Sequence, residues 1–209
     1  MFKNIVETSK KVDYSKLNPH IPKEAIAYIE KWLEPYWFHL VIKKPRSTKL
    51  GDYRVPQEGN PHIITVNSGM LKSLCFLTLT HEIAHLKAFD LYSRRIQPHG
   101  KEWKKTFSEM ISESIDVYEE ELKVILKVFM QNPKASFYAD KKLSEYFIRK
   151  QDPNALLLKD LHVNALFKIN NKFFYKLKKS KTRYICIEKN TGKRYLIAEN
   201  APVTEINVL

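Results

Sequence analysis

Three histidines and one glutamate gather between Leu77 and Trp103, with a spacing that could build a metal site. His81 and His85 are four residues apart, so on a helix their imidazoles lie on one face, one turn apart. Two nitrogens placed in this way can bind one zinc ion at about 2.0–2.1 Å each. Glu82 lies beside the pair and completes the H-E-x-x-H arrangement, in which the glutamate acts as a general base.

The third ligand must come from elsewhere in the chain, and His99 is the best candidate. It follows a break at Pro98, and Gly100 allows a tight turn there. Three protein ligands leave a fourth zinc position for water, which is typical of a catalytic site rather than a structural one. Zinc lowers the pKa of water toward about 7 and polarises a carbonyl group.

The alternative is that His81 and His85 are ordinary residues on a helix face, because so short a motif also occurs by chance. Against this, the motif lies in a strongly apolar segment and a third histidine follows a proline break. A buried, unpaired Glu82 would be costly, whereas a metal site explains it. We therefore expect one zinc ion held by His81, His85 and His99, with Glu82 as the catalytic residue.

The elements that must position these residues are predicted by apolar periodicity and by helix and strand boundaries. A long apolar helix over residues 71–92 would carry the motif, with a core face formed by Phe76, Leu79, Ile83 and Leu86. Gly51 and Asp52 are expected in a turn or hairpin. The other segments predicted before it are a helix within 21–35 and strands at 37–44 and 61–67.

Further helices are predicted after the histidines. One starts at Lys101, and another restarts where Asp116 and Glu119 resemble a capping box, running toward Met130. A short helix over about residues 140–149 follows.

The chain changes character after Asp152-Pro153, which we interpret as a domain boundary. Residues 162–206 alternate and are rich in β-branched and aromatic side chains, which predicts three to five short antiparallel strands. Their expected core consists of Phe167, Phe173, Tyr175, Tyr184, Cys186, Tyr195 and Ile197. The predicted fold class is therefore α+β, with domains at residues 1–153 and 154–209.

The chain is strongly basic, with 36 lysines and arginines against 23 aspartates and glutamates, a formal net charge of +13. Such an excess favours nucleic acid or another polyanion as a partner, although a generally basic protein is the alternative. Residues 161–209 contribute ten of the cations and only three glutamates.

This basic tail is a candidate nucleic-acid-binding module. Its interleaved aromatic residues could stack on bases while cations contact phosphates. The alternative is a solvated basic hairpin whose aromatic side chains form the core. The candidate DNA contacts are Lys172, Lys176, Lys178, Lys179, Lys181, Arg183, Lys193 and Arg194.

Two cysteines, Cys75 and Cys186, stand far apart and outside any C-x-x-C pattern, so neither a disulfide framework nor a cysteine zinc site is expected. No apolar run suits a signal peptide or approaches the roughly 20 residues needed to span a bilayer. A cytoplasmic location without membrane association is the resulting expectation.

The motifs carry a family resemblance. The sequence "HEIAH", followed after thirteen residues by "HGKEW", resembles the SprT-like zinc metalloproteases, which include the Spartan proteases that act on DNA–protein crosslinks. The "KLGDYR" and "NPKAS" segments are similar to bacterial members, and the match covers about Ile21 to Asp152. The resemblance implies a compact zincin-like core, zinc ligands at the three histidines, and Glu82 as the catalytic base.

The tail departs from many members of that family, which carry a cysteine-rich zinc ribbon after the protease core. Here it keeps only Cys186, so a second, structural zinc ion is not expected.

The resulting functional expectation is a zinc-dependent endopeptidase whose protein substrates are bound or crosslinked to DNA. Two alternatives stay open: a non-catalytic nucleic-acid-binding protein that retains a zinc site, and a metallopeptidase with no DNA partner. Tyr53, Tyr92 and Lys101 are the candidates for stabilising an oxyanion. The strand "HIITVN" could accept an extended peptide by strand addition.

Overall fold

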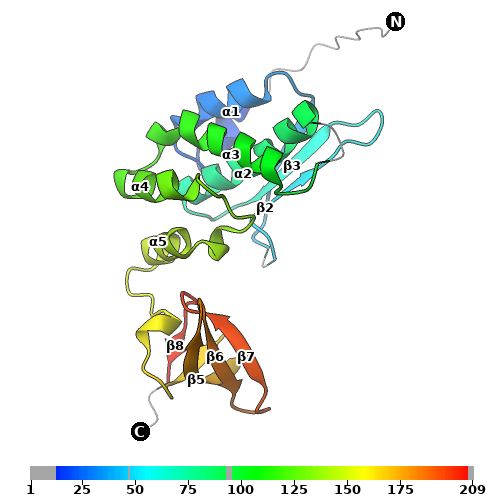
Figure 1. The fold of residues 1–209 in the computed structure, drawn as a ribbon. Helices are drawn as coiled ribbons and strands as arrows, with labels where there is room; N and C mark the ends of the chain where they lie inside the picture. The colour runs from blue at the N-terminus through cyan, green and yellow to red at the C-terminus, as the bar shows by residue number, and fades with distance from the viewer. Residues whose placement is uncertain (1–12, 47, 93–95, 207–209) are drawn as a thin grey trace, which may run out of the picture. The chain divides into compact units, whose positions relative to one another are not determined.

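The computed structural model of the protein describes residues 13–46, 48–92 and 96–206. Its contacts divide the chain into two compact units, Met1–Ala135 and Ser136–Leu209, with the first coloured blue to green and the second running to red in Figure 1. The sequence pattern places a boundary later, after Pro153. Helix α5 (Lys141–Gln151) lies between the two positions, and it forms ion pairs with Lys159 and Glu199, which follow it in the chain.

The first unit combines a small sheet with helices. Its elements are η1 (Tyr14–Leu17), α1 (Ala25–Leu33), β1 (Phe38–Lys43), β2 (Gly51–Arg54), β3 (His62–Asn67), α2 (Lys72–Tyr92), α3 (Lys101–Glu113), η2 (Ile115–Val117) and α4 (Glu120–Phe129). The strand order is β1-β3-β2, with β1 parallel and β2 antiparallel to β3. Helix α2 contacts α1, α3, β2 and β3, so it forms the centre of this unit.

Of the two alternatives predicted for Gly51 and Asp52, a turn or a hairpin, the structure shows the hairpin. Both residues lie in strand β2, which pairs antiparallel with β3 through Val66 and Thr65. A second local prediction for this unit is wrong. The expected capping box at Asp116 does not form. Helix α4 has Glu119 as its N-cap, with no side-chain capping hydrogen bond.

The second unit is built around an antiparallel sheet. Its elements are η3 (Phe137–Ala139), α5, η4 (Leu158–Asp160), β4 (Leu166–Ile169), β5 (Lys172–Ser180), β6 (Arg183–Glu188), β7 (Arg194–Ala198) and β8 (Thr204–Glu205), in the sheet order β7-β6-β5-β4-β8. The tight turns before β5 and β7 use Asn170 and Gly192, both in the left-handed region with φ of 52° and 66°. The predicted antiparallel β subdomain, and with it the α+β fold class, is confirmed.

The core of the second unit differs in part from the predicted one. Phe167 and Cys186 are buried as expected, but Phe174 takes the place of Phe173 and Tyr175. Phe174 is 5% exposed, whereas Tyr175 is 36% exposed. The predicted alternation of buried and exposed residues in β5 is therefore correct, but the buried positions are shifted by one residue.

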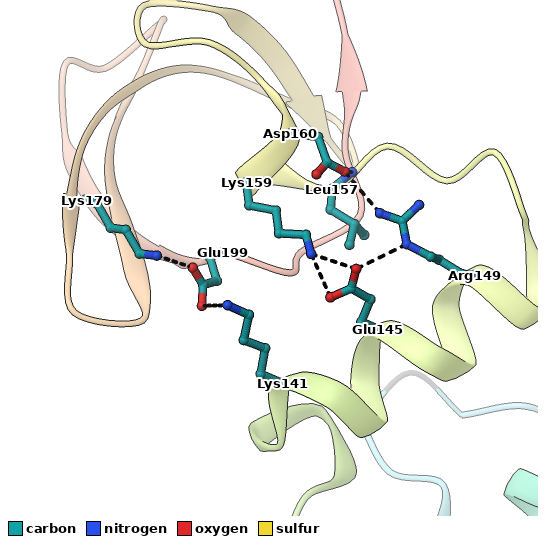
Figure 2. Close-up of polar contacts among 8 residues, drawn as sticks. All are labelled: Lys141, Glu145, Arg149, Leu157, Lys159, Asp160, Lys179 and Glu199. Atoms are coloured by element: carbon teal, nitrogen blue, oxygen red, sulfur yellow. Dashed lines mark hydrogen bonds and ion pairs between the residues drawn. The ribbon is translucent and has the colours of Figure 1, made fainter. Parts of the chain in front are cut away.

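Half-buried Glu145 joins α5 to the turn before β4. It accepts hydrogen bonds from Lys159 at 2.6 and 2.7 Å and from Arg149 at 3.2 Å (Figure 2). Lys159 lies in η4, so this carboxylate bridges two elements of the same unit. These partners lower the pKa of Glu145, with the Lys159 hydrogen bond as the largest cause.

Glu199 makes a second bridge, from the segment after β7. Its side chain is buried and pairs with Lys179 of β5 at 2.5 Å and with Lys141 of α5 at 2.9 Å (Figure 2). Hydrogen bonds from Lys179 and then Lys141 lower the pKa of this carboxyl. A buried carboxylate with two cationic partners holds helix and strand together, since removing either partner would leave a buried charge less compensated.

Within the part of the chain that the structure describes, no helix combines the length and apolar character required to cross a membrane.

Candidate metal centre

His81 and His85 are presented by α2, the most buried helix of the first unit. Its predicted core-facing residues Phe76, Leu79, Ile83 and Leu86 are all 0% exposed. Packing of that face fixes the rotation of the helix, so the two imidazoles are held toward α3 and β2. His81 is buried and contacts Phe107 of α3, and His85 is half-buried.

His99 reaches the same place from the turn that precedes α3. Its backbone lies in the left-handed region, with φ of 58°, a conformation that costs a non-glycine residue about 1–3 kcal/mol and clusters at functional sites. The turn is closed by Gly100, whose N–H donates to the Gln97 carbonyl at 2.8 Å. A β carbon on Gly100 would lie 2.9 Å from that oxygen, so the turn requires glycine there.

The three imidazoles converge through their Nε2 atoms. The separation is 3.2 Å between His81 and His85, 3.0 Å between His85 and His99, and 3.2 Å between His99 and His81. Three nitrogens bound to one tetrahedral zinc ion at about 2.0–2.1 Å would lie roughly 3.3 Å apart. Among the described residues these three histidines form a group that could hold a metal ion.

Hydrogen bonding alone cannot satisfy this triangle. The Nε2 atom of a neutral imidazole either carries a hydrogen or offers a lone pair. Among three such atoms at least two are alike, and that pair cannot form a hydrogen bond. A cation that accepts all three lone pairs removes the conflict, so the donor set fits a metal ion.

The environment keeps the three rings neutral, which is the form that binds metal. Burial lowers the pKa of His81 to about 2 and that of His85 to about 3, with the charges of the neighbouring histidines acting in the same direction. Burial also lowers the pKa of His99.

Trp103 of α3 supports all three rings. Its ring centroid lies 4.6 Å from that of His81, 5.2 Å from that of His85 and 4.7 Å from that of His99. Its indole N–H also points to the His81 carbonyl, at 3.4 Å. The indole is fully buried, so it forms a rigid wall that limits how the imidazoles can turn.

Glu82 is buried and fits against the backbone of β2. A β carbon on Gly51 would lie only 2.5 Å from the Glu82 Oε1 atom, so the carboxylate occupies the space that the glycine leaves. Burial raises the pKa of Glu82 to about 8, and the charge of Asp52 adds to the effect. A hydrogen bond from the Tyr53 backbone N–H acts in the opposite direction.

The sequence reasoning named Tyr53 as an oxyanion candidate but missed its partner beside the site, His62. The Tyr53 ring lies parallel to that of His85, at 6.2 Å and 3°, and the Tyr53 hydroxyl contacts Nδ1 of His62 at 3.0 Å. His62 has no metal-ligand spacing to the other histidines, so nothing in the sequence predicted that it would contact Tyr53. Strand pairing brings it here, since His62 begins β3 and Tyr53 lies in its partner β2.

The other two oxyanion candidates, Tyr92 and Lys101, are exposed, and the strand proposed to bind a peptide has both of its edges paired. Tyr92 ends α2 with 39% exposure, and the Lys101 side chain is 92% exposed and pairs weakly with Glu102. Strand β3, the segment "HIITVN", is paired on both sides, so it has no free edge for a peptide. Strands β1 and β2 form the two edges of this sheet instead.

The eight cations predicted to contact DNA fall into three groups. Lys172 and Lys179 pair with Glu188 at 3.0 Å and Glu199 at 2.5 Å. Lys176 is 2% exposed, and its Nζ donates to the carbonyls of Lys159 and Leu161, so it is not available to a ligand. The remaining five, Lys178, Lys181, Arg183, Lys193 and Arg194, are exposed.

Comparison with known proteins gives a family match over the first unit. The model of the SprT-like family matches residues 37–123, which contain the three histidines and Glu82. Protein SprT of Pseudomonas fluorescens strain SBW25 is 49% identical over 45 residues, 21% of this chain and 25% of that protein. Protein SprT of P. fluorescens strain Pf-5 is 62% identical over 26 residues, 12% of this chain and 16% of that protein.

The chain thus spans a quarter or less of the length of each of these two curated relatives. No solved structure matches.

Proposed function

We propose that the chain is a zinc-dependent endopeptidase, because its residues 37–123 match the model of the SprT-like family. His81, His85 and His99 would hold the ion. The observation that carries the proposal is the convergence of three Nε2 atoms within 3.0–3.2 Å of one another, beside a buried glutamate. Zinc, when bound, would polarise the scissile carbonyl and lower the pKa of water.

The chain's own residues supply positioning and proton transfer. Trp103 and Tyr53 restrict the imidazole rings, so the donor atoms stay in place between turnovers. Glu82 acts as the general base: it takes a proton from the water that attacks the peptide carbonyl carbon. It then returns the proton to the amide nitrogen as the C–N bond breaks, so the step leaves a new carboxyl and a new amine.

We further propose that the substrate proteins are bound or crosslinked to DNA, and that residues 136–209 provide the DNA tether. The support is the charge of the chain, +13 overall, with the excess concentrated in the tail. A tether of this kind selects substrates by raising their local concentration rather than by a deep pocket.

The test compares the unmodified chain with Glu82→Gln, both loaded with zinc and assayed for zinc content and for cleavage of a protein crosslinked to an oligonucleotide. Glu82→Gln should bind zinc normally and lose at least about 100-fold in cleavage rate, the contribution expected of a general base. A chain treated with chelator should lose cleavage and regain it when zinc is restored.

Equal cleavage by the two proteins would remove Glu82 as the base. Zinc binding without cleavage of any protein, free or DNA-bound, would favour a non-catalytic role instead. Equal cleavage of free and DNA-bound substrate would remove the tether while leaving the endopeptidase in place.

A further inference from the structure

The strand register of the second unit divides its side chains into two faces. Phe174 of β5 and Cys186 of β6 are buried on the core side, where Tyr184 and Tyr195 also pack. Successive side chains of a strand point to opposite faces. The residues next to Phe174 and Cys186 along the chain therefore lie on the opposite side, which we call the outer face.

The outer face carries aromatic and aliphatic side chains that remain accessible. Tyr175 lies across from Ile187 and is 36% exposed, and Leu196 lies across from Ile185 and is 57% exposed. Half-buried Phe173 shares the strand and the face of Tyr175. The outer face therefore presents aromatic surface on the central strand β5 and aliphatic surface on the edge strand β7 to solvent.

Cations surround this apolar surface. Arg194 lies across from Ile187 and Arg183 across from Ala198, so both share the outer face and lie roughly 13 Å apart along the strands. Lys168 lies across from Phe173, with its Nζ 5.9 Å from the centre of that ring. Lys181, in the turn before β6, is also exposed.

In the described strands of this sheet no acidic residue lies on the outer face, because Glu205 of β8 lies across from the core residue Phe167. In the sequence from β4 to β7 the single acidic residue is Glu188, which lies on the core side. It pairs there with Lys172 at 3.0 Å and accepts hydrogen bonds from Thr191 and Tyr195. Within the described residues, no ion pair involves Lys168, Arg183 or Arg194, so their charges are available to an external anion.

A partner for this face must offer both negative charges and flat apolar groups. Single-stranded nucleic acid does so, because its phosphates follow the cations while unstacked bases lie against aromatic side chains. Duplex DNA presents phosphates but keeps its bases stacked inside, so it leaves Tyr175 and Phe173 without partners. An acidic peptide offers charge without the flat rings.

We propose that the outer face, defined by Lys168, Phe173, Tyr175, Arg183, Arg194 and Leu196, binds single-stranded nucleic acid, a step that rests on the tethering part of the function proposed above. Tyr175 and Phe173 stack on bases, and the three cations neutralise phosphates. Lys172, Lys176 and Lys179, on the core side, take no part.

The test measures fluorescence anisotropy of a labelled 20-nucleotide oligo(dT) and of a 20-base-pair duplex, titrated with the full chain at several salt concentrations. The variants are Tyr175→Ala, Tyr175→Phe and the double change Arg183→Glu with Arg194→Glu. The matched control places the same charge change on the first unit, as Lys105→Glu with Lys127→Glu, both at exposed positions. Circular dichroism and thermal midpoints verify that each variant folds.

Tyr175→Ala should weaken binding of the single strand at least about fivefold, Tyr175→Phe less than twofold, and neither should change duplex binding. The double arginine change should weaken binding of the single strand at least tenfold. It should also reduce the slope of log affinity against log salt concentration by about 1.4, since each lost phosphate contact on a single strand contributes roughly 0.7. The control should stay within twofold.

Three results would overturn the proposal. An equal loss in the Lys105/Lys127 control would mean that only net charge matters. Duplex binding as tight as single-strand binding, and unaffected by Tyr175→Ala, would mean that phosphates alone are bound. Competition by poly-glutamate as effective as by unlabelled oligo(dT) would indicate an acidic protein partner.

The binding test is independent of proteolysis. The Glu82→Gln chain should bind oligo(dT) as tightly as the unmodified chain, so a failed endopeptidase proposal leaves this result unchanged. Conversely, loss of the outer face should leave cleavage of a free protein substrate intact.

Discussion

The β carbon that Gly51 lacks would lie 2.5 Å from the Glu82 Oε1 atom and 2.8 Å from its Cγ. Real β carbons essentially never approach a non-bonded heavy atom so closely, so any side chain at position 51 would force the Glu82 side chain to shift. This contact joins the sheet to helix α2 at the residue proposed to carry the chemistry.

Gly51→Ala should therefore displace the Glu82 side chain. We expect it to destabilise the fold by about 1–3 kcal/mol, as overpacking does, and to reduce peptidase activity more than zinc content. Urea unfolding and zinc analysis on the same preparation measure both effects.

A double-mutant cycle with Glu82→Ala is the control for this contact. Removing the glutamate side chain should relieve most of the cost of Gly51→Ala, with a coupling of at least about 0.5 kcal/mol. Part of the cost should remain, because Thr78 Cγ2 would also lie 2.8 Å from the new β carbon. Purely additive effects would mean that the two residues do not meet in solution.

Zinc should stabilise the chain through His99. Unfolding free energy should rise by about 2.7 kcal/mol at a free zinc concentration 100 times the dissociation constant. His99→Ala removes one of three donors, so most of this gain should disappear in a thermal unfolding assay with and without zinc. His39→Ala, an exposed histidine of β1, should keep the gain in full. The same zinc response in both variants would exclude His99 as a ligand.

Lys176 should act as a structural residue although it belongs to the basic tail. Its Nζ lies 4.0 Å from the centre of the Tyr184 ring and donates to two backbone carbonyls. Lys176→Met leaves those carbonyls without their donor and should cost about 1–3 kcal/mol in denaturant unfolding. Lys178→Met, at the exposed neighbouring site, should stay within about 0.5 kcal/mol. Equal costs would contradict the burial of Lys176.

Stability should fall in acid partly through Glu199. Its pKa in the folded chain is below the ordinary value of 4.5, because Lys179 and Lys141 favour the charged form. The stabilisation is therefore fully present above pH 4.5 and is lost as the pH falls through the lower, folded value. Glu199→Gln should be less stable than the unmodified chain at pH 7, and the difference should shrink below pH 4.5.

Unfolding by urea at pH 7 and at pH 3 to 4.5 measures this change. Glu109→Gln, which alters an exposed carboxylate of α3, is the control and should change little at either pH. A difference between Glu199→Gln and the unmodified chain that stays constant with pH would remove the Glu199 bridge as its cause.

Local patterns were sufficient to predict the part of the site that lies on one helix. His81, Glu82 and His85 follow from helical spacing, and the apolar face of α2 shows how that helix must be rotated. His99 could be predicted as the third ligand because Pro98 before it and Gly100 after it mark a turn. These are short-range signals, and the structure brings all three imidazoles together as they indicate.

The rest of the site depends on strand pairing, which leaves little trace in local sequence. The sequence placed Gly51 in a turn or hairpin, but its contact with Glu82 could not be predicted, because that contact forms only when α2 packs on β2. His62 contacts Tyr53 only because β3 pairs with β2 in a particular register. In the tail, the aromatic run Phe173-Phe174-Tyr175 fits either phase of a strand, so the sequence could not decide which ring is buried.

X-ray absorption at the zinc edge of the purified full chain tests the central claim most directly. The account predicts one zinc ion per chain with three imidazole nitrogens at about 2.0–2.1 Å and a fourth, non-protein oxygen. A zinc ion with fewer than three imidazole ligands, or a spectrum unchanged by His99→Ala, would contradict it.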